Sequence, residues 1–178
     1  MISKIRRLDH LVIDNISRMH SPALNMVMKT ASRSANVGII WWLVCLPFLF
    51  IPGWRAVGFN FVISICFAHV MGEGLIKHLV KRVRPCHDLE EDEQIIDPPR
   101  FYSFPSGHTT ASFSMVGVAA FRGLPLFITL PILFVALLIS FSRIYLRVHY
   151  LSDVVAGVIL GLSCSAVSVL FFRLVIGF

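Results

Sequence analysis

The amino-acid sequence predicts an all-α integral membrane protein, a helical bundle of about five transmembrane helices preceded by N-terminal amphipathic helices. Two observations favour this fold class. Hydrophobic residues make up 56% of the 178 residues and charged residues only 15%, a balance that is rare in soluble domains. The charges also lie between long apolar runs, so we expect lipid to surround most of the chain. The length fits a single membrane-embedded domain over residues 1–178.

Residues 1–33 are expected to form an interfacial amphipathic segment. Basic residues outnumber acidic ones there, and Ile5, Leu8 and Val12 are among the apolar residues that recur at helical spacing. This pattern is typical of a basic helix that lies in the membrane surface. A second short helix is expected to begin after Ser21. Docking of the segment on the bundle is a compatible alternative.

Five stretches within residues 34–178 are predicted to cross the bilayer, since a span needs about 20 apolar residues. They are residues 34–54, 56–72 with a polar helical end reaching Lys81, 105–121, 123–142 and 154–172. The connection over residues 85–104 is acidic and rich in proline, so it is predicted to be a solvated loop. Alternation of the spans places the N-terminus, this loop and the segment 143–153 on one side of the membrane.

Unusual polar side chains gather on that same side in three clusters. They are Lys77 with Arg84, then Ser106, Gly107 and His108, then Arg143, His149 and Asp153. Ionisable groups at membrane depth are costly and usually mark a functional site. Three cations in one place need a multiply charged anion as their common partner, and guanidinium groups match phosphate oxygens. The sequence therefore predicts a phosphate site.

The other groups in these clusters suit phosphoryl transfer. Ser106 and Gly107 open a predicted helix, whose free N–H groups and partial positive charge favour an anion. His149 and Asp153 are four residues apart, so on a helix they would share one face and the carboxylate would orient the imidazole for attack. His108 comes from another helix and is suited to protonate a leaving oxygen.

The order and spacing of the clusters resemble the three-part signature of the type 2 phosphatidic acid phosphatase family, whose relatives include vanadium haloperoxidases. The signature reads Lys77, six residues, Arg84-Pro85; Pro105-Ser106-Gly107-His108; and Ser142-Arg143, five residues, His149, three residues, Asp153. It spans residues 77–153, and the helix pattern extends the likeness over about residues 35–172.

The resemblance implies a metal-independent phosphatase without a cofactor, acting on a lipid phosphate through a phosphohistidine. His149 would be the nucleophile and Asp153 its orienting partner, while His108 would be the acid toward the leaving group and then the base for water. The implied phosphate-binding residues are Lys77, Arg84, Ser106, Gly107 and Arg143. The implied substrates are polyprenyl diphosphates and lipids of the phosphatidate or phosphatidylglycerophosphate type. Many members have six spans, whereas five are counted here.

Other interpretations remain open. A non-catalytic lipid-binding module would not need His149 paired with Asp153, and a haloperoxidase using bound vanadate is disfavoured by the apolar spans. Zinc held by His108, His149 and Asp153 is disfavoured because the surrounding cations repel a metal ion. Nucleic-acid binding is not expected, since no such motif accompanies the net charge of +6. The expected partners are therefore a lipid phosphate and the bilayer, and the oligomeric state is not indicated.

The neighbouring charges and the membrane side need separate interpretations. Glu73, four residues before Lys77, is interpreted as an ion-pair partner, with substrate contact as the alternative. Lys81, Arg82 and Arg147 are interpreted as interfacial anchors, with attraction to lipid headgroups as the alternative. The basic N-terminal segment favours a cytoplasmic position for the side that carries the site. The family resemblance implies an extracytoplasmic site in the cell membrane, and we expect the latter.

Overall fold

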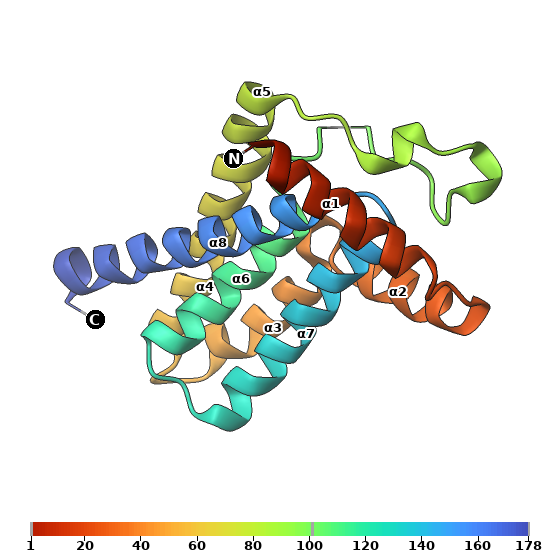
Figure 1. Ribbon diagram of the computed structural model, residues 1–178. Helices are drawn as coiled ribbons and strands as arrows, with labels where there is room; N and C mark the ends of the chain where they lie inside the picture. The colour runs from red at the N-terminus through yellow and green to blue at the C-terminus, as the bar shows by residue number, and fades with distance from the viewer. Residues whose placement is uncertain (1, 101, 178) are drawn as a thin grey trace.

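The computed structural model describes residues 2–100 and 102–177, and every regular element in these ranges is helical. The longer helices are α1 (Ile2–Ser17), α2 (Pro22–Ser34), α3 (Ile39–Phe50), α4 (Arg55–His69), α6 (Gly107–Phe121), α7 (Leu126–Tyr145) and α8 (Leu151–Phe171). The short pieces are η1 (Asn36–Gly38), η2 (Val70–Ile76), α5 (Lys77–Val80), η3 (Pro85–Asp88), η4 (Glu91–Glu93) and η5 (Phe172–Ile176). The predicted all-α membrane fold is confirmed. Figure 1 shows the bundle, with α1 crossing one end.

The spans differ in part from those predicted. Within residues 2–100 and 102–177, three helices are long and apolar enough to cross a membrane: Arg55–Val80, Leu126–Tyr145 and Leu151–Val175. In addition, α2 and the helix Asn36–Phe50 pass the same test as a pair bent by 56°. The positive φ of Val37 (54°) and Gly38 (73°) produces this break. α6 has 15 residues, fewer than a span of about 20 needs. The count of five spans therefore stays a prediction.

α6 lies inside the bundle, packed against α4, α7 and α8. Ten of its 15 residues are buried. Two glycines allow α8 to approach it closely: a Cβ on Gly161 would lie 2.4 Å from the carbonyl oxygen of Thr110, and one on Gly157 would lie 2.9 Å from that of Ser106. The start of α6 is thereby held against the first turns of α8.

Apolar residues of α3, α4, α6 and α7 form the main core, which includes Trp41, Phe61, Met115 and Ile139, each at most 1% exposed. The outer faces are also apolar. Large exposed side chains there include Phe59, Phe127, Phe134, Ile159 and Leu170. An apolar outer surface fits contact with lipid, where the helices satisfy their own backbone hydrogen bonds.

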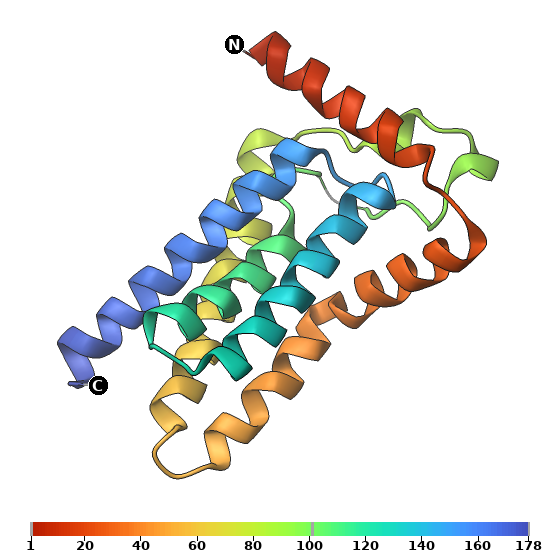
Figure 2. The same ribbon diagram turned by 60° about the horizontal axis from the view of Figure 1, so that its bottom comes forward.

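The N-terminal segment docks on the bundle through one face of α1. Ile13 packs with Ile144, Tyr150 and Val154 at the junction of α7 and α8, and Figure 2 shows α1 lying across that end of the bundle. Side chains on the opposite face, including Leu8 and Leu11, are exposed. The docking alternative is thus found, and the position of residues 1–33 in the membrane surface stays a prediction.

The two ends of the bundle differ in chemistry, as the alternating topology predicts. At the end away from α1, Arg173 Nη2 donates to the carbonyl oxygen of Phe121 at 2.7 Å. Buried charged residues gather at the other end, where α6 and α8 begin: Asp9, Lys77, Arg84, Arg143, His149 and Asp153. The candidate site is therefore built at the α1 end.

Candidate active site

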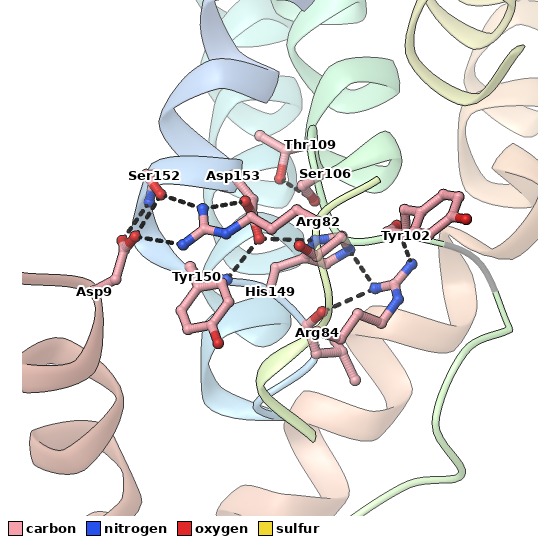
Figure 3. Close-up of polar contacts among 12 residues, drawn as sticks. Asp9, Arg82, Arg84, Tyr102, Ser106, Thr109, His149, Tyr150, Ser152 and Asp153 are labelled. Atoms are coloured by element: carbon pink, nitrogen blue, oxygen red, sulfur yellow. Dashed lines mark hydrogen bonds and ion pairs between the residues drawn. The ribbon is translucent and has the colours of Figure 1, made fainter. Parts of the chain in front are cut away.

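His149 lies in the turn between α7 and α8 and is 1% exposed. Its Nδ1 is 3.6 Å from Oδ2 of Asp153, and Nη1 of Arg84 donates to its Nε2 at 3.0 Å, as Figure 3 shows. A guanidinium N–H can only donate, so Nε2 carries a lone pair and Nδ1 carries the proton that faces Asp153. The imidazole is therefore held in the tautomer whose Nε2 can act as a nucleophile.

The pairing of His149 with Asp153 does not arise from a shared helical face, so that assumption is wrong. α8 begins at Leu151, and Tyr150 is its N-cap residue. The N–H of Tyr150 donates to Oδ2 of Asp153 at 2.9 Å, as part of a capping box. This turn brings His149 over the first turn of α8, so the two side chains still meet.

Arg84 is held by two main-chain carbonyl oxygens. Its Nη1 donates to the carbonyl of Val148 at 2.8 Å, and its Nη2 donates to that of Tyr102 at 3.0 Å. The whole side chain is 3% exposed. The guanidinium is thus fixed beside Nε2 of His149, where a phosphoryl group would need a positive charge.

Lys77 and Glu73 form an ion pair in which Nζ and Oε1 are 2.6 Å apart. Glu73 belongs to the π-helical segment η2, a geometry that occurs often at functional sites. Its carboxylate also occupies the space beside Gly107, because a Cβ on this glycine would lie 1.8 Å from Oε1 of Glu73. The ion-pair interpretation of Glu73 is confirmed, and Gly107 is the residue that makes room for it.

Ser106 is the N-cap residue of α6 and links two of the sequence clusters. Its N–H donates to the carbonyl oxygen of Asp153 at 3.0 Å, and its Oγ accepts from Oγ1 of Thr109 at 3.0 Å. The main-chain N–H of Ser106 is therefore engaged with α8, which leaves its hydroxyl hydrogen as the group that an anion can use.

Asn36 and Ser32, both in the N-terminal half, reach the site although no motif points to them. Nε2 of His108 donates to Oδ1 of Asn36 at 3.0 Å, so Nδ1 is the nitrogen that can exchange a proton. Nη1 of Arg143 donates to Oγ of Ser32, on α2. Asn36 and Ser32 stand far from the signature in sequence, and neither lies in a recognisable pattern.

Burial holds the pKa of His149 well below its usual range, and the positive charges of Arg84, Arg143 and Lys77 lower this pKa further. All three cations therefore lie within electrostatic reach of one imidazole. The imidazole of His108 also lies within electrostatic reach of the same three cations and of His149. The structure thus brings the three sequence clusters together, with the imidazole of His149 neutral at physiological pH.

Arg82 has partners on both sides, so its interpretation as an interfacial anchor is wrong. Nη1 lies 2.7 Å from Oδ1 of Asp153, and Nη2 lies 2.8 Å from Oδ2 of Asp9. Both pairs are visible in Figure 3. The carboxylate of Asp153 is therefore shared between His149 and Arg82.

A cavity of about 510 Å³ opens beside His108 and Arg143. Its walls include Lys29 and Arg33 of α2 and the loop residues 95–97. In residues 2–100 and 102–177, no group of three or more His, Cys, Asp or Glu side chains is arranged to hold a metal ion.

Comparison with known proteins identifies relatives over most of the bundle. A family model described as the PAP2 superfamily matches residues 53–176. An undecaprenyl-diphosphatase of Sulfolobus acidocaldarius is 32% identical over 130 residues, which are 73% of this chain and 62% of that relative. A decaprenylphosphoryl-5-phosphoribose phosphatase of Mycobacterium tuberculosis is 44% identical over 96 residues, 52% of this chain and 49% of that relative.

The fold has a close counterpart among solved structures. The crystal structure of Aquifex aeolicus LpxE is similar with a TM-score of 0.78 and 25% sequence identity, over 91% of this chain and 94% of that chain. The chain spans less than two thirds of the length of the two curated relatives, 62% and 49%.

Proposed function

This chain belongs to the PAP2 superfamily, and on that premise we propose that it is a membrane phosphatase that hydrolyses a lipid phosphate through a phosphohistidine on His149. The observation that carries the proposal is the state of this imidazole. Its Nε2 lone pair faces Arg84 at 3.0 Å, and its Nδ1 faces Asp153 at 3.6 Å. A buried, neutral imidazole with a carboxylate behind it and cations in front is suited to attack phosphorus.

The first half of the proposed reaction transfers the phosphoryl group to the protein. Lys77, Arg84 and Arg143 bind the phosphate oxygens, and Nε2 of His149 forms a bond to phosphorus as the bond from phosphorus to the lipid oxygen breaks. His108, which the negative charge of the bound phosphate keeps protonated on both nitrogens, gives its Nδ1 proton to that leaving oxygen and becomes neutral. The new positive charge on the imidazole is stabilised by Asp153, whose distance of 3.6 Å leaves room for the contact to shorten.

The second half releases inorganic phosphate. His108, now neutral, takes a proton from a water molecule, whose oxygen attacks phosphorus in line with the N–P bond. That bond breaks, its electron pair returns to Nε2, and His149 is regenerated. No step requires a metal ion, because the three cations stabilise the charge on the equatorial oxygens.

The cavity beside the site favours a polyprenyl diphosphate over a phosphatidate-type lipid. Lys29 and Arg33 are four residues apart on α2 and line the same cavity as His108 and Arg143. A diphosphate has a second charged phosphate next to the one that is removed, and these two cations suit it. Two of the similar proteins are named for polyprenyl substrates. The paired change Lys29→Gln with Arg33→Gln is expected to slow diphosphate hydrolysis more than phosphatidate hydrolysis.

Phosphate release from a panel of lipid phosphates in the presence of EDTA tests the main proposal. We expect turnover without added metal and loss of turnover in His149→Ala, and a ³²P-labelled substrate is expected to label the wild-type protein in an acid-labile form. Retained turnover in His149→Ala would exclude this nucleophile, and loss of activity with EDTA would exclude the metal-free mechanism. No turnover of any lipid by the intact protein would favour a non-catalytic module.

We place the site on the extracytoplasmic face, which a labelling experiment tests. Asp92 is exposed in the acidic loop, and Figure 2 shows that loop at the end of the bundle that α1 crosses. Asp92→Cys, in a chain whose four native cysteines are replaced, is expected to react with a membrane-impermeant maleimide in intact cells. Labelling only after permeabilisation would place the site in the cytoplasm.

A further inference from the structure

Asp9 is a buried carboxylate on a helix that otherwise lies at the surface of the molecule. It is 1% exposed, although its neighbours on α1, Leu8 and His10, are exposed. A buried carboxylate is costly unless it is paired and hydrogen-bonded. Asp9 lies outside residues 53–176, which match the family model. The superfamily signature therefore does not explain why this carboxylate is buried.

The partners of Asp9 all lie at the start of α8 or next to it. Oδ1 accepts the N–H of Ser152 at 2.9 Å, and Oδ2 accepts the hydroxyl of Ser152 at 2.6 Å. Oδ2 also accepts from Nη2 of Arg82 at 2.8 Å. Ser152 is the second residue of α8, so Asp9 caps the N-terminus of this helix although it is distant in sequence. Asp153 is the third residue of the same helix.

Arg82 joins this carboxylate to the one that faces the nucleophile. One Nη1 atom serves both Asp153 Oδ1 and the Ser152 hydroxyl, each at 2.7 Å. The guanidinium also lies over the ring of Tyr150, with its central carbon 4.0 Å from the ring centroid. A planar group held at both ends and on one face has little freedom to rotate, so it restrains the carboxylate plane of Asp153.

The charges in this chain of contacts explain why two carboxylates are present. Arg82 alone would neutralise Asp153 and weaken its attraction for the imidazolium that forms during catalysis. Asp9 supplies a second negative charge to Arg82, so the three groups together carry one net negative charge. Asp153 can then both stay oriented and stabilise positive charge on His149.

We propose that Asp9 and Arg82 are positioning residues that hold Asp153 for the nucleophile His149, and that α1 is for this reason a part of the catalytic apparatus. The proposal rests on the proposed function, since it assumes the phosphohistidine on His149. It extends the site by contacts running from Asp9 through Arg82 and Asp153 to His149 (Figure 3).

The test compares Asp9→Asn with Asp14→Asn, a matched control that removes the same charge from an exposed position of the same helix. Asp9→Asn is expected to lower kcat about tenfold or more, because small displacements of a reacting group are costly. KM is expected to change less than about twofold, since Lys77, Arg84 and Arg143 still bind phosphate. Asp14→Asn is expected to keep both constants.

Two further variants separate positioning from folding. Arg82→Lys keeps the charge but lacks the planar fork, and Ser152→Ala removes one hydroxyl from the contacts without changing any charge. Both are expected to lower kcat while the unfolding temperature in detergent stays near that of the wild type. A wild-type kcat in Asp9→Asn would overturn the proposal. If Asp9→Asn does not fold, a wild-type kcat in both Arg82→Lys and Ser152→Ala would overturn it.

The outcome for His149 separates this inference from the proposed function. Turnover in His149→Ala would contradict the nucleophile itself, whatever Asp9→Asn does. An inactive His149→Ala together with a fully active Asp9→Asn would leave the nucleophile in place and reject only the role of Asp9. Equal losses in Asp9→Asn and Asp14→Asn would show a general charge effect of α1 and would also reject it.

Discussion

Arg84 and His149 share a hydrogen bond, from Nη1 of the guanidinium to Nε2 of the imidazole across 3.0 Å. The nitrogen that we propose as the nucleophile therefore faces a cation that we propose to bind phosphate. A phosphoryl group that enters between them accepts the guanidinium N–H in place of Nε2. Substrate binding then exposes the lone pair that attacks.

The pH dependence of turnover should report the neutral state of His149. Burial and the neighbouring cations lower its pKa, so the imidazole keeps its lone pair at pH values where a free histidine, with a pKa of about 6.5, is protonated. We expect the acid limb of kcat/KM to lie below that pH. A limb at or above the pKa of free histidine would contradict a neutral, buried nucleophile.

Substitution of Arg84 should shift that limb in a predictable direction. Loss of the positive charge in Arg84→Gln favours protonation of His149, raises its pKa and moves the acid limb to higher pH, while kcat/KM falls about a hundredfold or more. Arg84→Lys keeps the charge and should leave the limb in place. Both variants share one substrate, so its own ionisation cancels in the comparison. An unchanged limb in Arg84→Gln would show that Arg84 does not act on His149.

Gly107→Ala should disturb phosphate binding through Glu73. The added Cβ would lie 1.8 Å from Oε1 of Glu73, so the carboxylate must move and Lys77 loses its partner at the site. We expect KM to rise and kcat/KM to fall about tenfold. Gly74→Ala is the matched control, because no atom lies within 4 Å of its added Cβ. Equal kinetics for the two variants would show that Glu73 adapts without effect.

Asn36→Ala should impair proton transfer by His108. Without the bond of 3.0 Å to Oδ1 of Asn36, the imidazole loses the partner that keeps the proton on Nε2. Hydrolysis of an alkyl lipid phosphate is expected to slow about tenfold. Hydrolysis of p-nitrophenyl phosphate should slow less, since its leaving oxygen needs no proton. In His108→Ala, a further Asn36→Ala should have no effect, and additive losses would mean that Asn36 acts elsewhere.

Gly161→Val should destabilise the bundle. A Cβ at this position meets the carbonyl oxygen of Thr110 at 2.4 Å and the amide nitrogen of Ser114 at 2.9 Å. Backbone atoms cannot move aside, so we expect a loss of about 1–3 kcal/mol, measured by thermal or denaturant unfolding in detergent. Ser163→Val, on the exposed face of the same helix, should have little effect. Equal stability of both variants would contradict the close approach of α6 and α8.

The sequence was sufficient to predict those parts of the site that depend on local spacing. The clusters of Lys77, His108 and His149 could be found because each lies at the end of a helix, and alternating spans bring such ends to one side. The partner of Lys77 could also be predicted, since Glu73 precedes it by one helical turn. The helical character of the fold followed from composition and apolar runs.

The contacts of the N-terminal segment could not be predicted in this way. Asp9, Ser32 and Asn36 meet residues between 72 and 143 positions away, as set by how α1 and α2 dock. Nothing in the spacing around Arg82 distinguishes an ion-paired arginine from an interfacial one. The break between α2 and α3 depends on the left-handed backbone of Val37, a β-branched residue that seldom adopts it.

The enclosure of α6 by α4, α7 and α8 bears on how the chain enters the bilayer. Thr110, Ser112 and Ser114 are buried in it, and their hydroxyls donate to carbonyl oxygens of α6 itself or of its cap at 2.7–2.9 Å. At about 1.5 Å per residue, 15 residues fall short of a hydrocarbon layer of about 30 Å. Such a segment is a poor candidate for independent insertion. During biogenesis α6 is expected to enter together with α7, because only the four residues 122–125 connect the two helices. The proposed phosphate site is then completed last, when α8 arrives.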